Sequence, residues 1–338
     1  MDKQACGTSG LVLPLLGVGC WSFGGGEGDY WGEQDQTSAE AVVHAALDAG
    51  ANYFDTAEGY NEGRSEESLG RALKTRRQEA IIGTKVFPGN ARPDLLRSHC
   101  EGSLRRLATD TIDLYMIHWP ITDYPVGPAF ETLADLQREG KIRYVGVSNF
   151  GVRQIREAAQ AAAYAGIAIA ANQLYYNLLS RAIEFEILPE CQRLGIGIVG
   201  YMPLQQGLLT GKYYSADELP PVRTRTRHFS GDRPLARHGE PGAEEEVFQV
   251  IEALRSIAAE TGYPVEQLAL NWAARQPGVT CALTGVRNRA QLEEAVEAVS
   301  QPFPAELTAR LTALTEPLKH QLGANADYFQ GIAGSRVH

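Results

Sequence analysis

Short apolar runs rich in β-branched residues alternate along the chain with longer stretches whose apolar positions recur every three or four residues. The first pattern is typical of buried strands and the second of amphipathic helices. The short runs predict eight strands, at residues 15–19, 52–55, 80–85, 112–118, 142–148, 169–173, 197–201 and 280–284. Strands that alternate with helices pair in parallel, so eight such units predict an α/β chain folded as a (β/α)8 TIM barrel.

The helices between these strands have recognisable ends and faces. One is expected at residues 36–49, just before Gly50, and another begins at Pro93. Further helices are predicted at residues 152–164 and 183–194, the latter ending before Gly195. Between the seventh and eighth strands, a polar segment rich in Pro and Arg predicts a long loop at residues 212–241, followed by one amphipathic helix.

Two segments fall outside the eight units and are predicted to cover the ends of the barrel. Residues 7–14 have turn and strand character and predict an N-terminal β-hairpin, and residues 305–314 predict an extra helix followed by a tail. A chain of 338 residues fits one barrel with loop insertions. Residues 1–338 are therefore predicted to form a single domain.

Composition and charge restrict the classes of partner. Hydrophobic residues make up 44% of the chain, and no apolar run approaches the roughly 20 residues that a membrane span requires. The formal net charge of −10 would repel a polyphosphate backbone, so neither a membrane nor nucleic acid is an expected partner. Residues 1–10 lack the features of a secretory signal, which predicts a cytoplasmic protein.

The cysteines and histidines predict neither disulfides nor a metal. The five cysteines are scattered and are never spaced C-x-x-C, so we expect reduced thiols. The seven histidines form no H-E-x-x-H pattern, and no metal site is predicted.

Three consecutive predicted strands end in ionisable residues: Asp55, Lys85 and His118. Strand ends converge on the active site of a barrel, and Tyr60 follows Asp55 closely enough to reach the same rim. Taken singly, each of these side chains has an ordinary interpretation, such as a helix cap, a solvated lysine, a rim histidine or loop packing. Together, a carboxylate, a lysine, a phenol and an imidazole predict an acid catalyst.

This set of groups suits the reduction of a carbonyl, which must be protonated as it gains negative charge. A tyrosine with a pKa of about 10 is a reluctant donor at neutral pH. An ammonium about 4 Å away is worth on the order of 4 kcal/mol, which predicts that Lys85 lowers the pKa of Tyr60. Asp55 would hold Lys85 in its charged form, and His118 would donate a hydrogen bond to the carbonyl oxygen.

At these residues the chain resembles a known family. D-T-A-x-x-Y, the strand-end T-K and I-H-W-P are similar to the Asp, Tyr, Lys and His tetrad of the aldo-keto reductases, and the likeness extends over residues 13–314. The resemblance implies that Tyr60 is the general acid or base, that Lys85 and Asp55 tune it, and that His118 orients the substrate. The long loop at residues 212–241 is closer to the sugar and cyclitol dehydrogenase and channel-β-subunit-like branches than to aldose reductase.

The resemblance also implies NADPH or NADP⁺ as the cofactor, with NADH possible. The residues it assigns to the cofactor are Trp21, Ser148, Asn149, Gln173, Tyr201, Pro203, Leu204, Gly207, Leu209, Gly211, Lys212, Gly285, Arg287, Gln291 and Glu294. Arg287 can bind a phosphate through two N–H groups, which favours NADPH. Thr284 and Ala295 depart from the Pro and Asn that family members often carry near the adenine.

The predicted substrate is a small carbonyl compound or polyol, and aromatic residues are its expected contacts. Phe23, Trp31 and Trp119 fall on the predicted rim, where rings suit sugars and apolar aldehydes equally. The function predicted is NADPH-dependent reduction of an aldehyde or ketone (sugar, cyclitol or small carbonyl), or the reverse oxidation. Two alternatives stay open, an NADPH-binding sensor or regulatory subunit with slow turnover and a Schiff-base lyase using Lys85. The sequence leaves monomer and homo-oligomer undecided.

Overall fold

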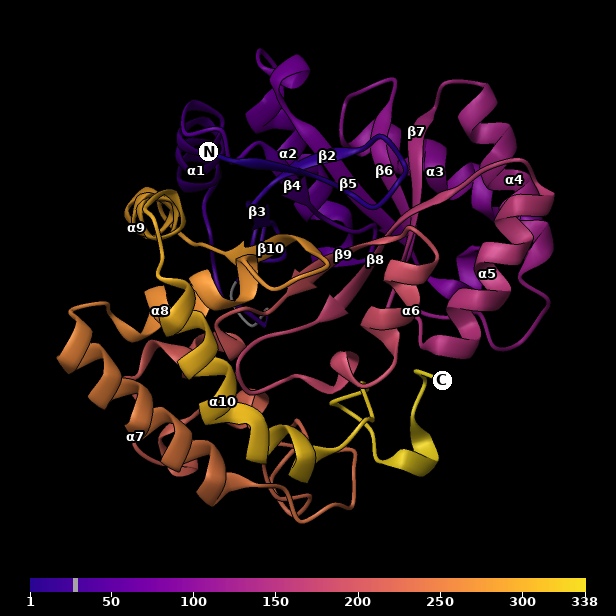
Figure 1. Ribbon diagram of the computed structural model, residues 1–338. Helices are drawn as coiled ribbons and strands as arrows, with labels where there is room; N and C mark the ends of the chain where they lie inside the picture. The colour runs from indigo at the N-terminus through magenta and orange to yellow at the C-terminus, as the bar shows by residue number, and fades with distance from the viewer. Residues whose placement is uncertain (27–29) are drawn as a thin grey trace.

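Eight parallel strands close into a barrel in this computed structural model, which describes residues 1–26 and 30–338 (Figure 1). Going around the barrel, each strand pairs with the next along the chain, and the last pairs with the first. The barrel strands are β3 (Leu16–Gly19), β4 (Tyr53–Asp55), β5 (Ile81–Val86), β6 (Ile112–Ile117), β7 (Ile142–Ser148), β8 (Ile169–Tyr175), β9 (Gly197–Tyr201) and β10 (Val279–Gly285). The predicted (β/α)8 fold is confirmed.

The strands read as continuous apolar runs because helices cover their outer faces. Every residue of β6 and of β8 is buried, as expected for parallel strands with no solvent-facing side. Their register brings the strand ends together, because Lys85 pairs with Met116 and Ser148 pairs with Gln173. Polar residues at the carboxyl ends of neighbouring strands therefore meet at one rim.

Helices form the outer ring of the barrel (Figure 1). Those that follow the barrel strands are α1 (Gln36–Asp48), α2 (Arg64–Leu73), α3 (Pro93–Arg106), α4 (Gly127–Arg138), α5 (Val152–Tyr164), α6 (Ile187–Arg193), α7 (Glu244–Thr261), α8 (Val265–Ala274) and α9 (Arg289–Ser300). The extra C-terminal helix, α10, spans Ala305–Leu322 and packs against α7 and α8. It is longer than predicted and continues through Pro317.

Two predicted helices differ from the structure. The predicted helix at residues 183–194 is divided into a short 3-10 turn and α6, because Pro189 lacks the N–H needed beyond a first helical turn. Between β9 and β10 there are two helices rather than one. Gly262 ends α7 with a φ of 77°, and Pro264 precedes α8. The second helix was missed because nearly all of its residues are buried, which removes the alternation of polar and apolar positions.

A β-hairpin at the N-terminus, β1 (Lys3–Ala5) and β2 (Val12–Pro14), closes the amino-terminal end of the barrel. Its buried side chains Cys6, Leu11 and Leu13 join a cluster with Leu114 and Met116 from inside the barrel. The hairpin predicted from residues 7–14 is thus confirmed. Its first strand lies earlier than expected, and residues 7–10 form the turn.

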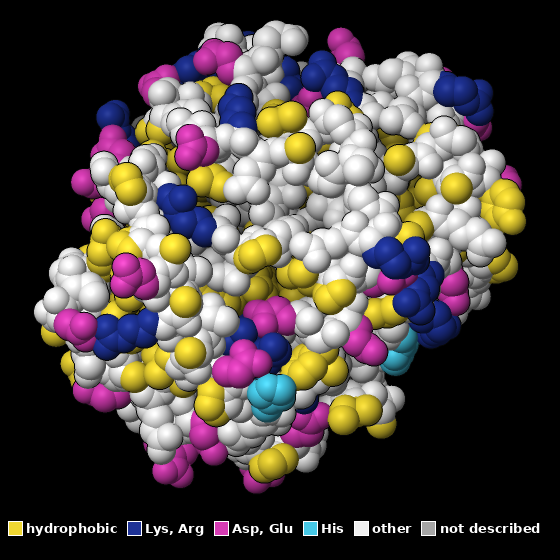
Figure 2. Space-filling model, viewed as in Figure 1, with side chains coloured by type: hydrophobic (Ala, Val, Ile, Leu, Met, Phe, Trp, Pro, Cys, Tyr) yellow, Lys and Arg dark blue, Asp and Glu magenta, His cyan; other side chains and the backbone are white. Residues whose placement is uncertain are grey.

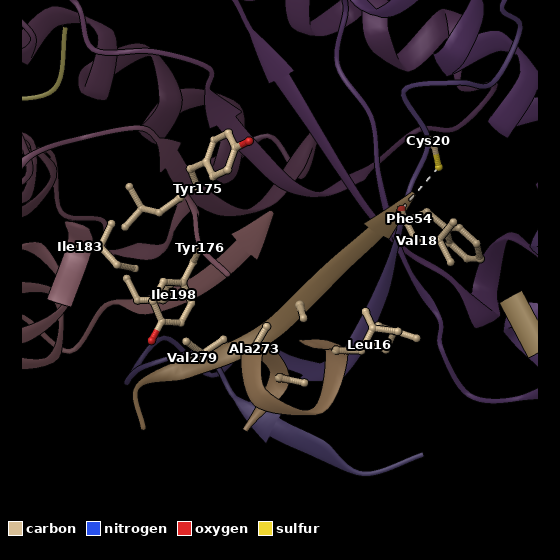
Figure 3. Packing of buried hydrophobic residues seen from close by; sticks show 14 of the residues in the cluster. Leu16, Val18, Cys20, Phe54, Tyr175, Tyr176, Ile183, Ile198, Ala273 and Val279 are labelled. Atoms are coloured by element: carbon tan, nitrogen blue, oxygen red, sulfur yellow. Dashed lines mark hydrogen bonds between the residues drawn. The ribbon is translucent and has the colours of Figure 1, made fainter. Parts of the chain in front are cut away.

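Packing between the barrel and its helices produces the larger core. Figure 3 shows Leu16, Val18 and Phe54 at one side of this cluster and Tyr176 and Ile198 at the other. Burying a side chain of this size contributes about 1.5–3 kcal/mol. The five cysteines are all buried and free, in agreement with the reduced thiols expected from the sequence.

The surface carries both signs of charge. Figure 2 shows Lys and Arg side chains interspersed with Asp and Glu side chains over the visible face. Within residues 1–26 and 30–338, no helix combines the length and the apolar character needed to cross a membrane.

The loop after β9 and the C-terminal tail are tied together above the carboxyl end of the barrel. In the loop, buried His228 donates through Nε2 to the carbonyl oxygen of Leu179 and accepts at Nδ1 from the amide of Gln205. Its Nε2 also lies 3.1 Å from Oγ of Ser180, and its ring stacks on Tyr328 at 4.9 Å. Burial lowers the pKa of His228 to about 4, so the imidazole is neutral and acts as a structural link. This packing fixes both segments beside the rim.

Candidate active site

A buried ion pair lies at the centre of the rim. Lys85, at the end of β5, is fully buried, and its Nζ lies 2.6 Å from Oδ2 of Asp55 and 2.8 Å from the carbonyl oxygen of Thr56. The amide of Gln173 donates to the other oxygen of Asp55 at 2.7 Å. Both charges are therefore hydrogen-bonded, which is the condition under which a buried pair is tolerated.

Tyr60 completes this group from the loop after β4. Its Oη lies 3.4 Å from Nζ of Lys85, and its ring stacks on Trp21 with centroids 5.5 Å apart. The turn that follows is unusual, because Asn61 and Glu62 both have positive φ. The amide of Asn61 stabilises it by donating to the carbonyl oxygens of Trp21 and Phe23 at 2.9 and 2.8 Å. This turn holds the phenol over the ion pair.

His118 follows the end of β6 and faces the same space. Its ring lies 5.6 Å from that of Tyr60 and stacks on Phe87 at 5.4 Å. Burial and the charge of Lys85 hold the pKa of His118 well below its usual range, so the imidazole is neutral. Its Nδ1 is buried without a hydrogen-bond partner in the described chain, as expected of a group that awaits a ligand.

The predicted effect of Lys85 on Tyr60 is not found in the structure. Burial and the carboxylate of Asp55 raise the pKa of Tyr60 well above its usual value, while burial lowers the pKa of Lys85. The sequence argument included the ammonium but not the burial of both groups. Tyr60 is therefore a firmly protonated phenol, and Lys85 is the more readily deprotonated neighbour.

Amide and hydroxyl groups from the next three strands extend the site. Ser148 Oγ donates to the carbonyl of Gln173 at 3.0 Å, and the amide of Asn149 donates to the carbonyl of His118 at 3.1 Å. Tyr201, at the end of β9, donates to Oδ1 of Asn149 at 2.9 Å and lines the cleft with its ring. These residues come from distant parts of the sequence and form one polar wall beside the tetrad.

A strained segment after β9 forms the next part of the wall. Gln205, Gln206 and Gly207 all have positive φ, so the chain turns tightly at the cleft surface. Of the residues expected here, Pro203, Leu204, Gly207 and Lys212 line the cleft. Leu209 and Gly211 do not. The side chain of Leu209 is fully buried in the core, and Gly211 ends the turn and accepts a hydrogen bond from Arg255.

The far end of the cleft lies between β10 and the start of α9. Gly285, Arg287, Gln291 and Glu294 all line it, as expected. Asn288 caps α9 by accepting from the backbone N–H of Gln291, and Oε1 of Gln291 accepts from the N–H of Arg287 at 2.9 Å. The guanidinium of Arg287 donates to the carbonyl of Glu33 at 2.8 Å, which links this end to the loop before α1.

Apart from Lys85, Leu209 and Gly211, the predicted catalytic and cofactor residues line one continuous cleft of about 1090 Å³. Trp21, Trp31 and Trp119 lie on its surface, as the sequence predicted for rim aromatics. Phe23 does not, because its ring is fully buried in the core below the loop. A substrate contact at Phe23 was therefore wrongly predicted from its place among exposed aromatics.

Sequence reasoning missed several side chains of the cleft. Phe87 follows β5, and Phe329 and Arg336 reach the cleft from the C-terminal tail. Arg336 lies 3.7 Å above the ring of Trp119 and forms an ion pair with buried Asp327. No local pattern marks a tail segment as part of a site, because its position depends on tertiary contacts.

Comparison with known proteins settles the family. The profile of the Aldo/keto reductase family matches residues 15–316. The chain belongs to this family. It is therefore an aldo-keto reductase, an oxidoreductase of the class that carries out NAD(P)H-dependent carbonyl reduction, as its strand-end residues predicted.

Several relatives cover most of the chain. The aldo-keto reductase YhdN of Bacillus subtilis is 33% identical over 307 residues, 87% of each chain. The NADH-specific methylglyoxal reductase of Escherichia coli is 32% identical over 89% of this chain and 94% of its own. A probable voltage-gated potassium channel subunit beta of Oryza sativa subsp. japonica is 32% identical over 88% and 91%. The predicted likeness to channel β subunits is thus confirmed.

Solved structures agree with this assignment. An aldo/keto reductase from Klebsiella pneumoniae, solved in complex with NADP and acetate, matches with a TM-score of 0.73 and 27% identity. The match covers 100% of this chain and 99% of that chain.

Proposed function

We propose that this aldo-keto reductase uses NADPH to reduce an aldehyde or ketone, a sugar, cyclitol or small carbonyl, or carries out the reverse oxidation. The observation that carries the proposal is the contact of Tyr60 Oη with Lys85 Nζ at 3.4 Å, beside His118, at the base of a long cleft. A phenol, an ammonium and a neutral imidazole supply the proton and the hydrogen bonds that carbonyl reduction needs.

The cleft residues fit a dinucleotide. The polar wall of Ser148, Asn149 and Gln173 offers partners for a carboxamide, and the ring of Tyr201 offers a flat surface for stacking. The tight turn at Gly207 lets backbone approach a pyrophosphate. Bound here, NADPH supplies the hydride. Its phosphates would lie near Lys212 and Arg287. The Klebsiella relative, solved in complex with NADP, supports a dinucleotide as the ligand of this cleft.

Residues of the chain supply the proton that the carbonyl oxygen receives. Tyr60 donates its hydroxyl proton to the carbonyl oxygen as that oxygen gains negative charge, and His118 donates a hydrogen bond that directs the oxygen. The tyrosinate recovers a proton from Lys85, whose lowered pKa and 3.4 Å contact make it the nearest acid. Asp55 favours the ammonium form of Lys85 and holds it in place.

Turnover separates this proposal from the sensor that the potassium channel subunit relatives suggest. We expect steady-state NADPH oxidation with a panel of aryl aldehydes, sugars and small ketones, with kcat of at least about 1 s⁻¹ on the best compound. Tight NADPH binding without turnover on any compound would favour the sensor. The structure does not favour a Schiff-base lyase, because Lys85 is fully buried and already has three partners.

Arg287 is proposed to select NADPH. Arg287→Ala is expected to weaken NADPH binding by roughly 10- to 100-fold and NADH binding by less than about 3-fold, because only NADPH offers a 2′-phosphate to the guanidinium. Fluorescence titration of both cofactors measures this. Arg289→Ala is the matched control, since Arg289 is exposed and pairs with Glu293. Equal losses for the two cofactors would exclude a phosphate contact at Arg287.

A further inference from the structure

The cleft is more basic than the protein as a whole. The chain has a formal net charge of −10, yet six basic and three acidic side chains from the described residues line the cleft. Lys212 and Arg287 have been assigned to phosphates above. Arg223 lies on the same side, because a side-chain carbon added at Gly207 would lie 3.6 Å from its Nη1. The remaining basic residues of the lining are Arg225 and Arg237, in the loop after β9, and Arg336, in the C-terminal tail.

Arg225 differs from its neighbours in the loop after β9. Arg227 and Arg233, which the sequence placed in the same basic segment, form ion pairs with Glu240 and Glu244. Arg336, in the C-terminal tail, forms an ion pair with Asp327. Arg225 lines the cleft, and no carboxylate of the described residues lies within ion-pair distance of it. Its charge is therefore free to act on a ligand.

The guanidinium of Arg225 lies against two aromatic rings. Its Cζ lies 4.9 Å from the centroid of Tyr30 and 5.2 Å from that of Phe329. Cation–π contacts of this kind restrict the guanidinium, whose N–H groups remain available at the edges of its plane. Nε of Arg225 is buried and has no hydrogen-bond partner in the described chain. A buried guanidinium N–H without an acceptor is rare and indicates a missing one.

Arg225 also lies on the same wall as the proton donor. Tyr30 stacks on Trp21 with centroids 4.9 Å apart, and Trp21 stacks on Tyr60. Arg225 is thus two rings away from Tyr60, on the side of the cleft that Phe329 borders. A substrate whose carbonyl faces Tyr60 extends toward this arginine when it follows the aromatic wall.

We propose that the carbonyl substrate carries a carboxylate and that Arg225 binds it. This inference rests on the proposed function and names the class of its substrate. The planar fork of an arginine matches the two oxygens of a carboxylate, and hydrogen bonds between charged partners are the stronger kind. A phosphate dianion would need further donors. Arg227 and Arg336 are paired with carboxylates, Arg223 lies toward the phosphate side of the cleft, and Arg237 is an exposed side chain of the loop.

Two aldehydes of the same shape test the proposal. 4-Carboxybenzaldehyde and 4-carbamoylbenzaldehyde differ at the far end of the ring only in an anionic carboxylate against a neutral amide. We expect wild-type kcat/KM to be at least about 10-fold higher for the carboxylate, chiefly through a lower KM. Arg225→Met should reduce this preference to less than about 2-fold and leave the amide's kcat/KM nearly unchanged.

Control variants separate a direct contact from a general loss of charge or folding. Arg225→Lys should keep part of the preference, because a lysine retains the charge but not the fork. Arg310→Met removes one positive charge from an exposed position on α10, where Arg310 pairs with Glu260, and should keep the full preference. Equal kcat/KM for both aldehydes in the wild type, or equal losses on both in Arg225→Met, would overturn the proposal. So would a large loss of NADPH affinity in Arg225→Met.

A binding measurement separates failure of the reductase function from failure of the carboxylate site. If the wild type reduces neither these two aldehydes nor any compound of the panel, the proposed function fails, and the carboxylate site is tested by binding alone. Calorimetric titration with 4-(hydroxymethyl)benzoate in the presence of NADP⁺ should then show binding to the wild type and at least about 10-fold weaker binding to Arg225→Met. Equal affinity of the two proteins would reject Arg225 as the carboxylate site.

Discussion

Replacing Tyr60 with phenylalanine is expected to lower kcat by about 10²- to 10⁴-fold, the usual contribution of a positioned general acid. The phenylalanine ring can still stack on Trp21, and only the hydroxyl 3.4 Å from Lys85 is lost. NADPH affinity should therefore stay within about 3-fold of the wild type. Stopped-flow measurement of NADPH oxidation on the best substrate of the panel, together with fluorescence titration of NADPH, gives both values.

Tyr115→Phe is the matched control for this loss. Tyr115 is also a buried tyrosine, on β6, and its hydroxyl has no partner in the described chain and does not line the cleft. Its substitution should leave kcat within about 2-fold of the wild type. A near-normal kcat in Tyr60→Phe would remove Tyr60 from the mechanism, and an equal loss in Tyr115→Phe would show that the effect is not specific to the site.

Replacing Lys85 with methionine is expected to reduce stability as well as activity. The change leaves the carboxylate of Asp55 buried, with the amide of Gln173 as its one remaining side-chain hydrogen-bond partner among the described residues. Removing one partner of a buried ion pair typically costs about 3–5 kcal/mol. Chemical denaturation should show a loss of this size, and kcat should fall because Tyr60 loses its nearest proton source.

The double variant Lys85→Met/Asp55→Asn isolates the cause. It removes the unpaired buried charge, so most of the lost free energy of unfolding should return while activity stays low. If the double variant is as unstable as Lys85→Met, the lost stability comes from altered packing and not from the unpaired buried charge of Asp55. An unchanged free energy of unfolding in Lys85→Met would contradict the presence of a buried ion pair between Asp55 and Lys85.

The barrel and its tetrad were predictable because both depend on local sequence. Each of Asp55, Lys85 and His118 ends a short apolar run, and the geometry of a parallel barrel brings all such ends to one rim. The sites of Arg287 and Gln291 were predictable for a similar reason, since they precede and open a helix next to the last strand. The structure adds the distances that make these residues one group.

Other features depend on tertiary contacts that no local pattern records. Phe23 and the rim tryptophans look alike in sequence, and only the packing of the loop buries one ring and exposes the others. Phe329 and Arg336 reach the cleft because Asp327 and Tyr328 anchor the tail from inside the fold. The raised pKa of Tyr60 could not be predicted either, since it depends on how deeply the phenol is buried and on its closeness to Asp55.

A crystal structure of the protein with NADP⁺ and an unreactive carbonyl analogue of its best substrate tests the central claim most directly. The account predicts the analogue's oxygen at about 2.6–3.2 Å from Oη of Tyr60, with the imidazole of His118 as its second donor. An analogue oxygen bound away from both groups, with Tyr60 in contact only with Lys85, would contradict the assignment of Tyr60 as the proton donor.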